Sequence, residues 1–174
     1  MTNELSFVST DNLDHDPYRR SQTRERALNV AIIQAEISES YEEYLKIFDA
    51  FYADDIAVTS DTLQDPIRGK GSVRALLANF LSPLHVMTEI GGLLVSIRQT
   101  AIPVDVAAET HSAWTLELIG ASGNTCTLSW CVLRQWKGSF VAHEHHYDYR
   151  QSGGPLTSSD LYFDAAARPT KLAS

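Results

Sequence analysis

The spacing of the apolar residues changes from helical to alternating at Pro83, and this change constrains the fold more than any other feature. Before Pro83, apolar residues recur every three or four positions, as in a helix that buries one face. After Pro83, they alternate with polar residues over several runs, which is typical of strands in an antiparallel sheet. Helices followed by a meander of strands indicate an α+β fold with the helices packed on one face of the sheet.

Three helices are predicted in the first half of the chain. The first begins near Ser21. The second begins at Ser40, where Ser40 and Glu43 have the spacing of a capping box. The third begins at Ser72 and ends before Pro83. Their apolar stripes are Ala27, Leu28, Ala31, Ile32 and Ala35; then Tyr41, Tyr44, Leu45, Phe48, Phe51 and Tyr52; then Val73, Leu76, Leu77, Phe80 and Leu81.

Strands are predicted at residues 56–59, 85–100, 106–119, 126–136 and 139–149. Lys137-Gly138 has the signature of a two-residue turn, and residues 122–124 suit a three-residue hairpin loop. These turns fix the register, because each pairs the residues on either side of it. Trp136 is thereby paired with Ser139, and Val132 with both His143 and Trp114.

This register divides the side chains between two faces. The predicted core face carries Trp114, Leu116, Leu118, Leu128, Trp130, Val132, Val141, His143, His145 and Tyr147, and the other carries Thr127, Ser129, Cys131, Gln135, Ala142, Glu144, His146 and Asp148. Imidazoles on a core face need hydrogen-bond partners. His143 and His145 could be satisfied by neighbours such as Ser112, could line a polar pocket beneath the helices, or could form a metal pair, although a catalytic zinc needs a third ligand that the sequence does not clearly supply.

Composition excludes several classes of function. The chain has 174 residues, which suits one domain, and a formal charge of -8 without a basic stripe, so nucleic acid is not an expected partner. No window approaches the ~20 consecutive apolar residues of a membrane helix, and the acidic N-terminus does not look like a secretory signal. We expect a mobile leader at 1–18, one domain at 19–150 and a C-terminal tail at 151–174.

The two cysteines indicate a reducing compartment. Cys126 and Cys131 lie five positions apart in one predicted strand, so they point to opposite faces and cannot form a disulfide with each other. Two free thiols fit a cytoplasmic protein.

Local signatures in a fixed order resemble a known superfamily. Phe51-Tyr52-Ala53-Asp54-Asp55 precedes a short strand, Asp65-Pro66 and Gly69 precede the third helix, and the run from Trp136 to His143 places a glycine turn before an apolar pair. Over residues 21–150, this order resembles the nuclear transport factor 2-like superfamily, and within it the SnoaL-like polyketide cyclase and ketosteroid-isomerase-like branch. The resemblance implies a cone-shaped α+β barrel, in which a curved antiparallel sheet encloses an apolar cavity, commonly in a homodimer.

The resemblance also implies a function. Its enzymes typically catalyse acid-base reactions without a cofactor, so we expect cyclisation, isomerisation or dehydration of a hydrophobic polyketide-like or steroid-like small molecule. The alternative is a non-catalytic ligand-binding or dimeric assembly module. Dimerisation is expected through the outer sheet face around Leu133 and Cys131.

Candidate site residues surround a pocket expected between the aromatic stripe of the second helix, the Val73–Leu81 helix and the Trp114/Trp130 face. His143 and His145 are the candidate base and acid, expected to converge on an open cavity with at least one free nitrogen, and Tyr147 is a candidate donor to an oxyanion. The candidate substrate-binding residues are Tyr52, Phe48, Phe80, Trp114, Trp130 and Asp65. The Asp-Pro setting of Asp65 is equally well explained by turn chemistry.

Overall fold

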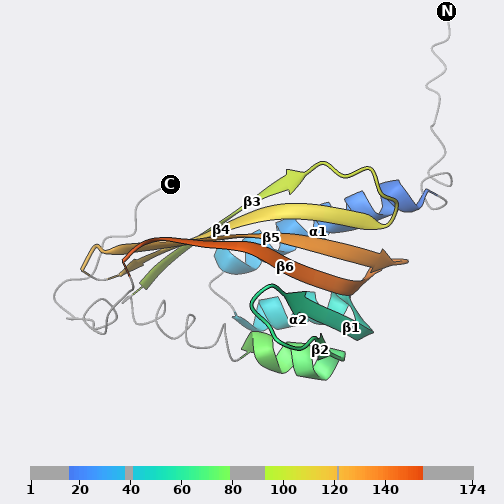
Figure 1. Ribbon diagram of the computed structural model, residues 1–174, viewed down its shortest axis with the longest axis horizontal. Helices are drawn as coiled ribbons and strands as arrows, with labels where there is room; N and C mark the ends of the chain where they lie inside the picture. The colour runs from blue at the N-terminus through green and yellow to red at the C-terminus, as the bar shows by residue number, and fades with distance from the viewer. Residues whose placement is uncertain (1–15, 38–40, 79–92, 121, 155–174) are drawn as a thin grey trace, which may run out of the picture.

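The computed structural model describes residues 16–37, 41–78, 93–120 and 122–154 (Figure 1). The elements in chain order are α1 (Pro17–Ile37), α2 (Tyr41–Phe51), β1 (Tyr52–Ser60), β2 (Ile67–Arg68), a helix whose described part is 70–78, β3 (Leu93–Ile102), β4 (Glu109–Gly120), β5 (Thr125–Lys137) and β6 (Phe140–Gly153). The predicted order of helices and strands is confirmed, and residues 79–92, including part of the predicted strand 85–100, lie outside the described chain.

The six strands form one open sheet in the order β2-β1-β6-β5-β4-β3. Strands β3 to β6 make the predicted antiparallel meander, whereas β1 runs parallel to β6. The α+β class is therefore confirmed, and the sheet is mixed rather than wholly antiparallel. A parallel partner is possible because the third helix and the meander separate β1 from β6 in the chain.

The helices cover one side of this sheet (Figure 1). α1 contacts α2, β3 and β4. Its stripe residues Leu28 and Ala35 are buried, as predicted, whereas Ala27 is exposed, so its predicted place in the stripe is wrong. We call the side of the sheet that faces α1 the inner face and the opposite side the outer face. The apolar core joins the α2 stripe to the third helix and the sheet through Leu28, Phe48, Tyr52, Ile56, Val58, Val73, Trp136 and Val141.

The β4–β5 hairpin has the predicted faces with a shifted register. The Gly120 N–H donates to the Asn124 carbonyl, so the loop closes one residue earlier than predicted. Trp114 therefore pairs with Trp130 rather than with Val132. Because the offset is two residues, each side chain keeps its predicted face. Cys126 and Cys131 lie on opposite faces and are both free thiols, as predicted.

The predicted register of the β5–β6 hairpin is wrong. The turn lies at Gly138-Ser139, where Gly138 has φ +64°, and Trp136 pairs with Val141. Gln135 then pairs with His143, which leaves Ala142 as an extra residue in a β-bulge. One extra residue reverses the alternation, so Glu144 and His146 face inward, and His143, His145 and Tyr147 lie on the outer face.

A second bulge restores the original alternation. Tyr147 pairs with Cys131, but Arg150 pairs with Ser129, so one additional residue is accommodated in β6 between them. Asp148 lies in this interval and has φ +55°, a backbone conformation that Asp tolerates better than most residues. Tyr149 is thereby turned to the inner face, where its ring stacks on Trp130.

Candidate functional site

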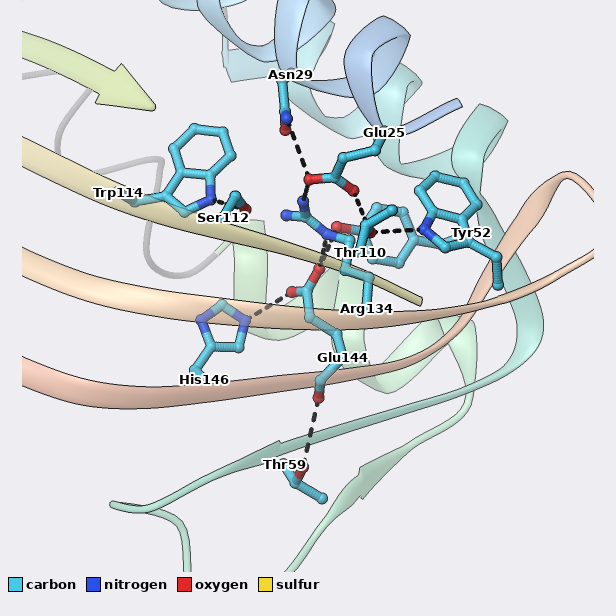
Figure 2. Close-up of polar contacts among 11 residues, drawn as sticks. Glu25, Asn29, Tyr52, Thr59, Thr110, Ser112, Trp114, Arg134, Glu144 and His146 are labelled. Carbon is cyan, nitrogen blue, oxygen red and sulfur yellow. Dashed lines mark hydrogen bonds and ion pairs between the residues drawn. The ribbon is translucent and has the colours of Figure 1, made fainter. Parts of the chain in front are cut away.

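Arg134 of β5 lies at the centre of a buried polar network on the inner face (Figure 2). Its Nη1 donates to Oε1 of Glu25 and its Nε donates to Oε2 of Glu144, each at 2.6 Å. Only 3% of Arg134 is exposed, and both glutamates are buried. Two carboxylates from α1 and β6 are thus joined through one guanidinium, whose planar donors suit such pairing.

Glu25 is held by α1 and β4 together. On α1, Ser21, Glu25 and Asn29 are four residues apart and all buried, so this polar row runs along the buried helix face beside Leu28. The Asn29 amide donates to Oε1 of Glu25 at 3.1 Å, and the Thr110 hydroxyl donates to Oε2 at 2.9 Å. Trp136 Nε1 donates in turn to the Thr110 oxygen at 2.8 Å, so both oxygens of Glu25 are satisfied.

Glu144 has partners on both carboxylate oxygens. The Tyr52 hydroxyl donates to Oε2 at 2.7 Å, and His146 Nε2 lies 2.6 Å from Oε1. Burial alone would raise the pKa of Glu144, but Arg134 and His146, with the hydrogen bonds from His146 and Tyr52, outweigh it and hold this pKa well below the usual range. Glu144 is therefore a carboxylate that only accepts hydrogen bonds.

The neighbours of Glu144 keep the proton on Tyr52. Burial, and then the negative charge of Glu144, raise the pKa of the Tyr52 hydroxyl well above its ordinary value. Burial by itself would lower the pKa of Arg134. Tyr52, Glu25 and Glu144 raise it by more than burial lowers it, so the pKa lies well above its ordinary value and the guanidinium stays charged. Tyr52 is thus a fixed donor and Arg134 a fixed cation within this network.

The contact with Glu144 fixes the proton on the His146 ring. Because the carboxylate can only accept, Nε2 of His146 carries the hydrogen, and in the neutral ring Nδ1 is left as an acceptor. Within the described part of the chain, no protein group is hydrogen-bonded to Nδ1. The side chain is 22% exposed, so this nitrogen belongs to a group that a small molecule can reach.

A row of aromatic rings crosses the inner face beside the network. Trp114 of β4 and Trp130 of β5 stack at 6.4 Å between ring centroids, and Trp130 and Tyr149 of β6 stack at the same distance, with interplanar angles of 13° and 19°. Exposure rises along the row from 3% at Trp114 to 47% at Tyr149. Arg134 lies 5.8 Å from the Trp114 ring centroid, so the buried end of the row adjoins the ionic network.

The predicted catalytic residues are not part of this inner site. His143, His145 and Tyr147 are on the outer face because of the bulge at Ala142, so their predicted position on the core face is wrong. The two histidines do converge, although on the Thr59 hydroxyl rather than on a cavity. His143 Nδ1 has no hydrogen-bond partner but is buried. A catalytic role for these residues stays a prediction, now for the outer face.

The predicted substrate-binding residues are distributed over several places. Tyr52 and Phe48 stack at 4.5 Å inside the apolar core, and Tyr52 also donates to Glu144. Trp114 and Trp130 share the inner face as predicted, with Trp130 half-buried. Asp65 is exposed between β1 and β2, away from the network, and Phe80 lies outside the described residues.

Sequence reasoning missed the charged members of the network. Arg134 alternates with Val132 and Trp136, so its inward direction was readable from the strand period. Glu25 lies on the same helix face as Leu28, which was also readable. The inward direction of Glu144 and His146 was not readable, because it depends on the bulge.

Two of the cavities formed by the described residues lie away from the aromatic row. One of about 510 Å³ is lined by Tyr52, Ala53, Asp54, Asp55, Lys70, Lys137 and Phe140, and one of about 350 Å³ by Ala31, Gln34, Ala35, Glu43 and Ile47. Neither includes Trp114 or Trp130. Within the described ranges, no group of three His, Cys, Asp or Glu side chains is arranged to hold a metal ion. Across the same ranges, no helix combines the length and apolarity that a membrane span requires.

Comparison by sequence with protein families and with curated proteins finds no match. Solved structures do match. A nuclear transport factor 2-like protein of unknown function from Cytophaga hutchinsonii has a TM-score of 0.51 at 12% identity, covering 73% of this chain and 97% of that one. A candidate isomerase from Bacillus subtilis has a TM-score of 0.52 at 6% identity, covering 77% of this chain and 88% of that one. A candidate polyketide cyclase from Xanthomonas campestris has a TM-score of 0.50 at 17% identity, covering 74% of this chain and 92% of that one. The chain therefore has the nuclear transport factor 2-like fold, as the sequence resemblance implied.

Proposed function

We propose that the inner face of this nuclear transport factor 2-like fold binds a planar hydrophobic small molecule and transfers a proton from it, with His146 as the general base. The observation that carries the proposal is the 2.6 Å contact between His146 Nε2 and the Glu144 carboxylate. A carboxylate that orients an imidazole fixes which nitrogen is basic, and it stabilises the imidazolium formed when that nitrogen takes a proton.

The rest of the network supports this role by holding Glu144 in place. Arg134 and Tyr52 occupy Oε2, so Oε1 is the oxygen directed at His146. Because the side chains of Arg134, Tyr52 and Glu144 are buried, their geometry does not have to reorganise when positive charge develops on the His146 ring. Proton abstraction of this kind is the common first step of the cyclisation, isomerisation and dehydration reactions expected from the sequence.

The aromatic row supports a flat substrate. Trp130 and the half-exposed Tyr149 present ring surfaces on the same face of β5 and β6 as His146. A planar ligand can stack on such surfaces, which adds to the gain from burying its apolar area. The names of two of the structural neighbours, a candidate isomerase and a candidate polyketide cyclase, are compatible with this chemistry. We therefore favour polycyclic or aromatic substrates over aliphatic ones.

A base-catalysed elimination tests the proposal without knowledge of the natural substrate. The probe is 5-nitrobenzisoxazole, a planar molecule that opens to a coloured phenolate when a base removes its carbon-bound proton. We expect saturable turnover by the wild type, slowed about 10²-fold in His146→Gln, which is the lower end of the contribution of a general base. His111→Gln is the matched control, because His111 lies on the outer face and should leave the rate unchanged.

Non-catalytic binding is the second candidate, and one observation favours it. Every oxygen of Glu25 and Glu144 already has a protein partner, as expected for a network that only stabilises the fold. The same experiment separates the two functions. Quenching of tryptophan fluorescence by the probe, together with equal elimination rates in the wild type and His146→Gln, would establish a binder and reject the catalyst.

We also propose a homodimer through the outer face, as the sequence suggested. Leu133 and Cys131 are half-buried there, next to each other in the alternation of β5. Sedimentation equilibrium on the wild type and on Leu133→Asp tests this assembly. A dimer that dissociates in the variant is expected, and a wild-type monomer at micromolar concentration would reject it.

A further inference from the structure

The outer face carries a second group of polar side chains that the inner site does not use. Thr59 of β1 lies beside His145 in the parallel pairing of β1 and β6, and its hydroxyl oxygen contacts two imidazoles. The distances are 2.9 Å to Nδ1 of His145 and 3.1 Å to Nε2 of His143. Figure 2 shows Thr59 near the backbone carbonyl of Glu144, away from the carboxylate of that residue.

The hydrogen positions in this group follow from Asp61. Its Oδ1 lies 3.4 Å from Nε2 of His145, at the distance of an ion pair, and the negative charge of the carboxylate favours the ring form with the hydrogen on Nε2. Nδ1 of the neutral ring is then an acceptor, and the Thr59 hydroxyl donates its single proton to it. The competing acceptor for that proton, the Glu144 carbonyl, lies farther away at 3.5 Å.

The contact with His143 completes the assignment. Since the only proton of Thr59 goes to His145, the His143 Nε2–H must donate to a lone pair of the Thr59 oxygen. Nδ1 of His143 is then unprotonated, and it is the nitrogen that has no partner among the described residues. Burial, and then the nearby His145, lower the pKa of His143, which favours the neutral ring that this arrangement needs.

We propose that Thr59 is a nucleophile that accepts an acyl group from small activated esters, with His145 as its general base and Asp61 as the residue that positions His145. A carboxylate, an imidazole and a hydroxyl in this order form the arrangement that activates an alcohol. Thr59 and His145 are half-buried and Asp61 is 61% exposed, so in the single chain a small ester can reach the hydroxyl from solvent. His145 pairs with Leu133 of the proposed dimer contact, so acylation is expected of the monomer.

The acyl transfer balances within this group. The Thr59 oxygen forms a bond to the ester carbonyl carbon while its proton passes to Nδ1 of His145. The carbon–oxygen bond to the leaving group then breaks, and the leaving group departs as an anion or takes the proton back from His145. The Nε2–H of His143 is placed beside the attacking oxygen, where it can donate to the negative charge that develops next to it.

The test measures acylation by p-nitrophenyl acetate and locates the acetyl group by peptide mass spectrometry. We expect one equivalent of nitrophenolate and one acetyl group on Thr59. His145→Asn should slow the reaction at least about 10²-fold, and Asp61→Asn by less. Thr62→Val is the matched control, because Thr62 is a nearby exposed hydroxyl without an imidazole partner, and it should label like the wild type.

Thr59→Ser keeps the proposal testable if Thr59→Val does not fold. The serine variant retains the hydroxyl and should be acetylated at residue 59 at least as fast as the wild type, whereas Thr59→Val should lose this label. Acetyl groups found only on lysines, or rates that do not change in His145→Asn, would overturn the proposal. The difference between the wild type and His146→Gln with 5-nitrobenzisoxazole reports on the inner face, and acetylation of residue 59 reports on the outer face, so the two proposals can fail separately.

Discussion

Adjacent residues of β6 belong to two very different polar groups. On the inner face, Glu144 and His146 join a charged network in which Arg134 is 3% exposed. On the outer face, His143 and His145 share one hydroxyl group in a half-exposed setting. The two groups are separated by the thickness of one strand, so their difference comes from burial rather than from local sequence.

Burial determines how much each group contributes to the free energy of unfolding. Charges out of water interact strongly, and removing one partner leaves the other uncompensated. Hydrogen bonds between neutral groups near water contribute little, because water can replace them. The inner group should therefore dominate stability, whereas the outer group should change with a small loss of stability.

The largest expected effect is the loss of Arg134. Arg134→Met should lower the free energy of unfolding by about 3–5 kcal/mol, because Glu25 and Glu144 would remain buried without a counter-charge. The matched control is Gln135→Met, because Gln135 is the next residue of β5 and lies on the outer face. This variant should change the free energy of unfolding by at most about 0.5 kcal/mol. Urea unfolding measures both, and similar losses in the two variants would contradict the comparison.

A combined variant sharpens the same point. If the cost in Arg134→Met comes from unpaired carboxylates, adding Glu25→Gln and Glu144→Gln should recover a large part of the lost stability. If the cost comes from lost packing instead, the triple variant will be no more stable than the single one.

The next effect compares two hydroxyl groups, one on each face. Tyr52→Phe removes a donor to a buried carboxylate and should cost about 1.5–3 kcal/mol. Thr59→Val removes a hydroxyl between two half-exposed imidazoles and should cost about 0.5–1.5 kcal/mol. Thermal unfolding of the two variants gives their order, and a larger loss in Thr59→Val would break the comparison.

Acid should weaken the inner group through Glu144. The pKa of this carboxyl is lower in the folded chain than in the unfolded chain, so its contribution is present above the unfolded value of about 4.3. The contribution is lost as pH falls below that value toward the folded pKa. The free energy of unfolding, measured above and below the unfolded value, should decrease as pH falls in the wild type. The decrease should be less steep in Glu144→Gln. Equal slopes would show that Glu144 is not linked to stability.

The smallest effect concerns His143 on the outer face. Its pKa is lowered by folding, so its contribution is present above the unfolded value of about 6.5 and is lost as pH falls from that value toward the lower folded pKa. Because the ring is partly exposed, the change in stability should be slight. NMR titration of the ring protons should place the His143 midpoint below that of an unfolded histidine, and a midpoint at or above it would contradict the assignment.

The fold was predictable because it depends on periodicity. The stripe of Leu28 and Ala35, the helical stripe through Phe48 and the alternation around Val132 each require only local spacing. Shifted turns in both hairpins moved partners by two residues and left every face unchanged up to Val141. Errors of that size do not affect a prediction of which elements form or which side is buried.

The site was not predictable because it depends on single-residue irregularities. The side-chain period in a strand is two, so one bulged residue exchanges the faces of everything that follows. Nothing about Ala142 in the sequence distinguishes a bulged residue from a paired one. Arg134 and Glu25 could have been found from their spacing, but their partner Glu144 could not.

The two bulges of β6 make residues 143–147 a unit whose orientation is independent of the rest of the strand. Val141 before it and Tyr149 after it keep the same face, so the aromatic row and the apolar core do not depend on which way this unit faces. During divergence, an insertion or deletion of one residue at each bulge would exchange all five side chains between the faces at once. Substitutions would need several steps for the same exchange, so changes of strand length are the shorter evolutionary route for moving this set of polar side chains from one face to the other.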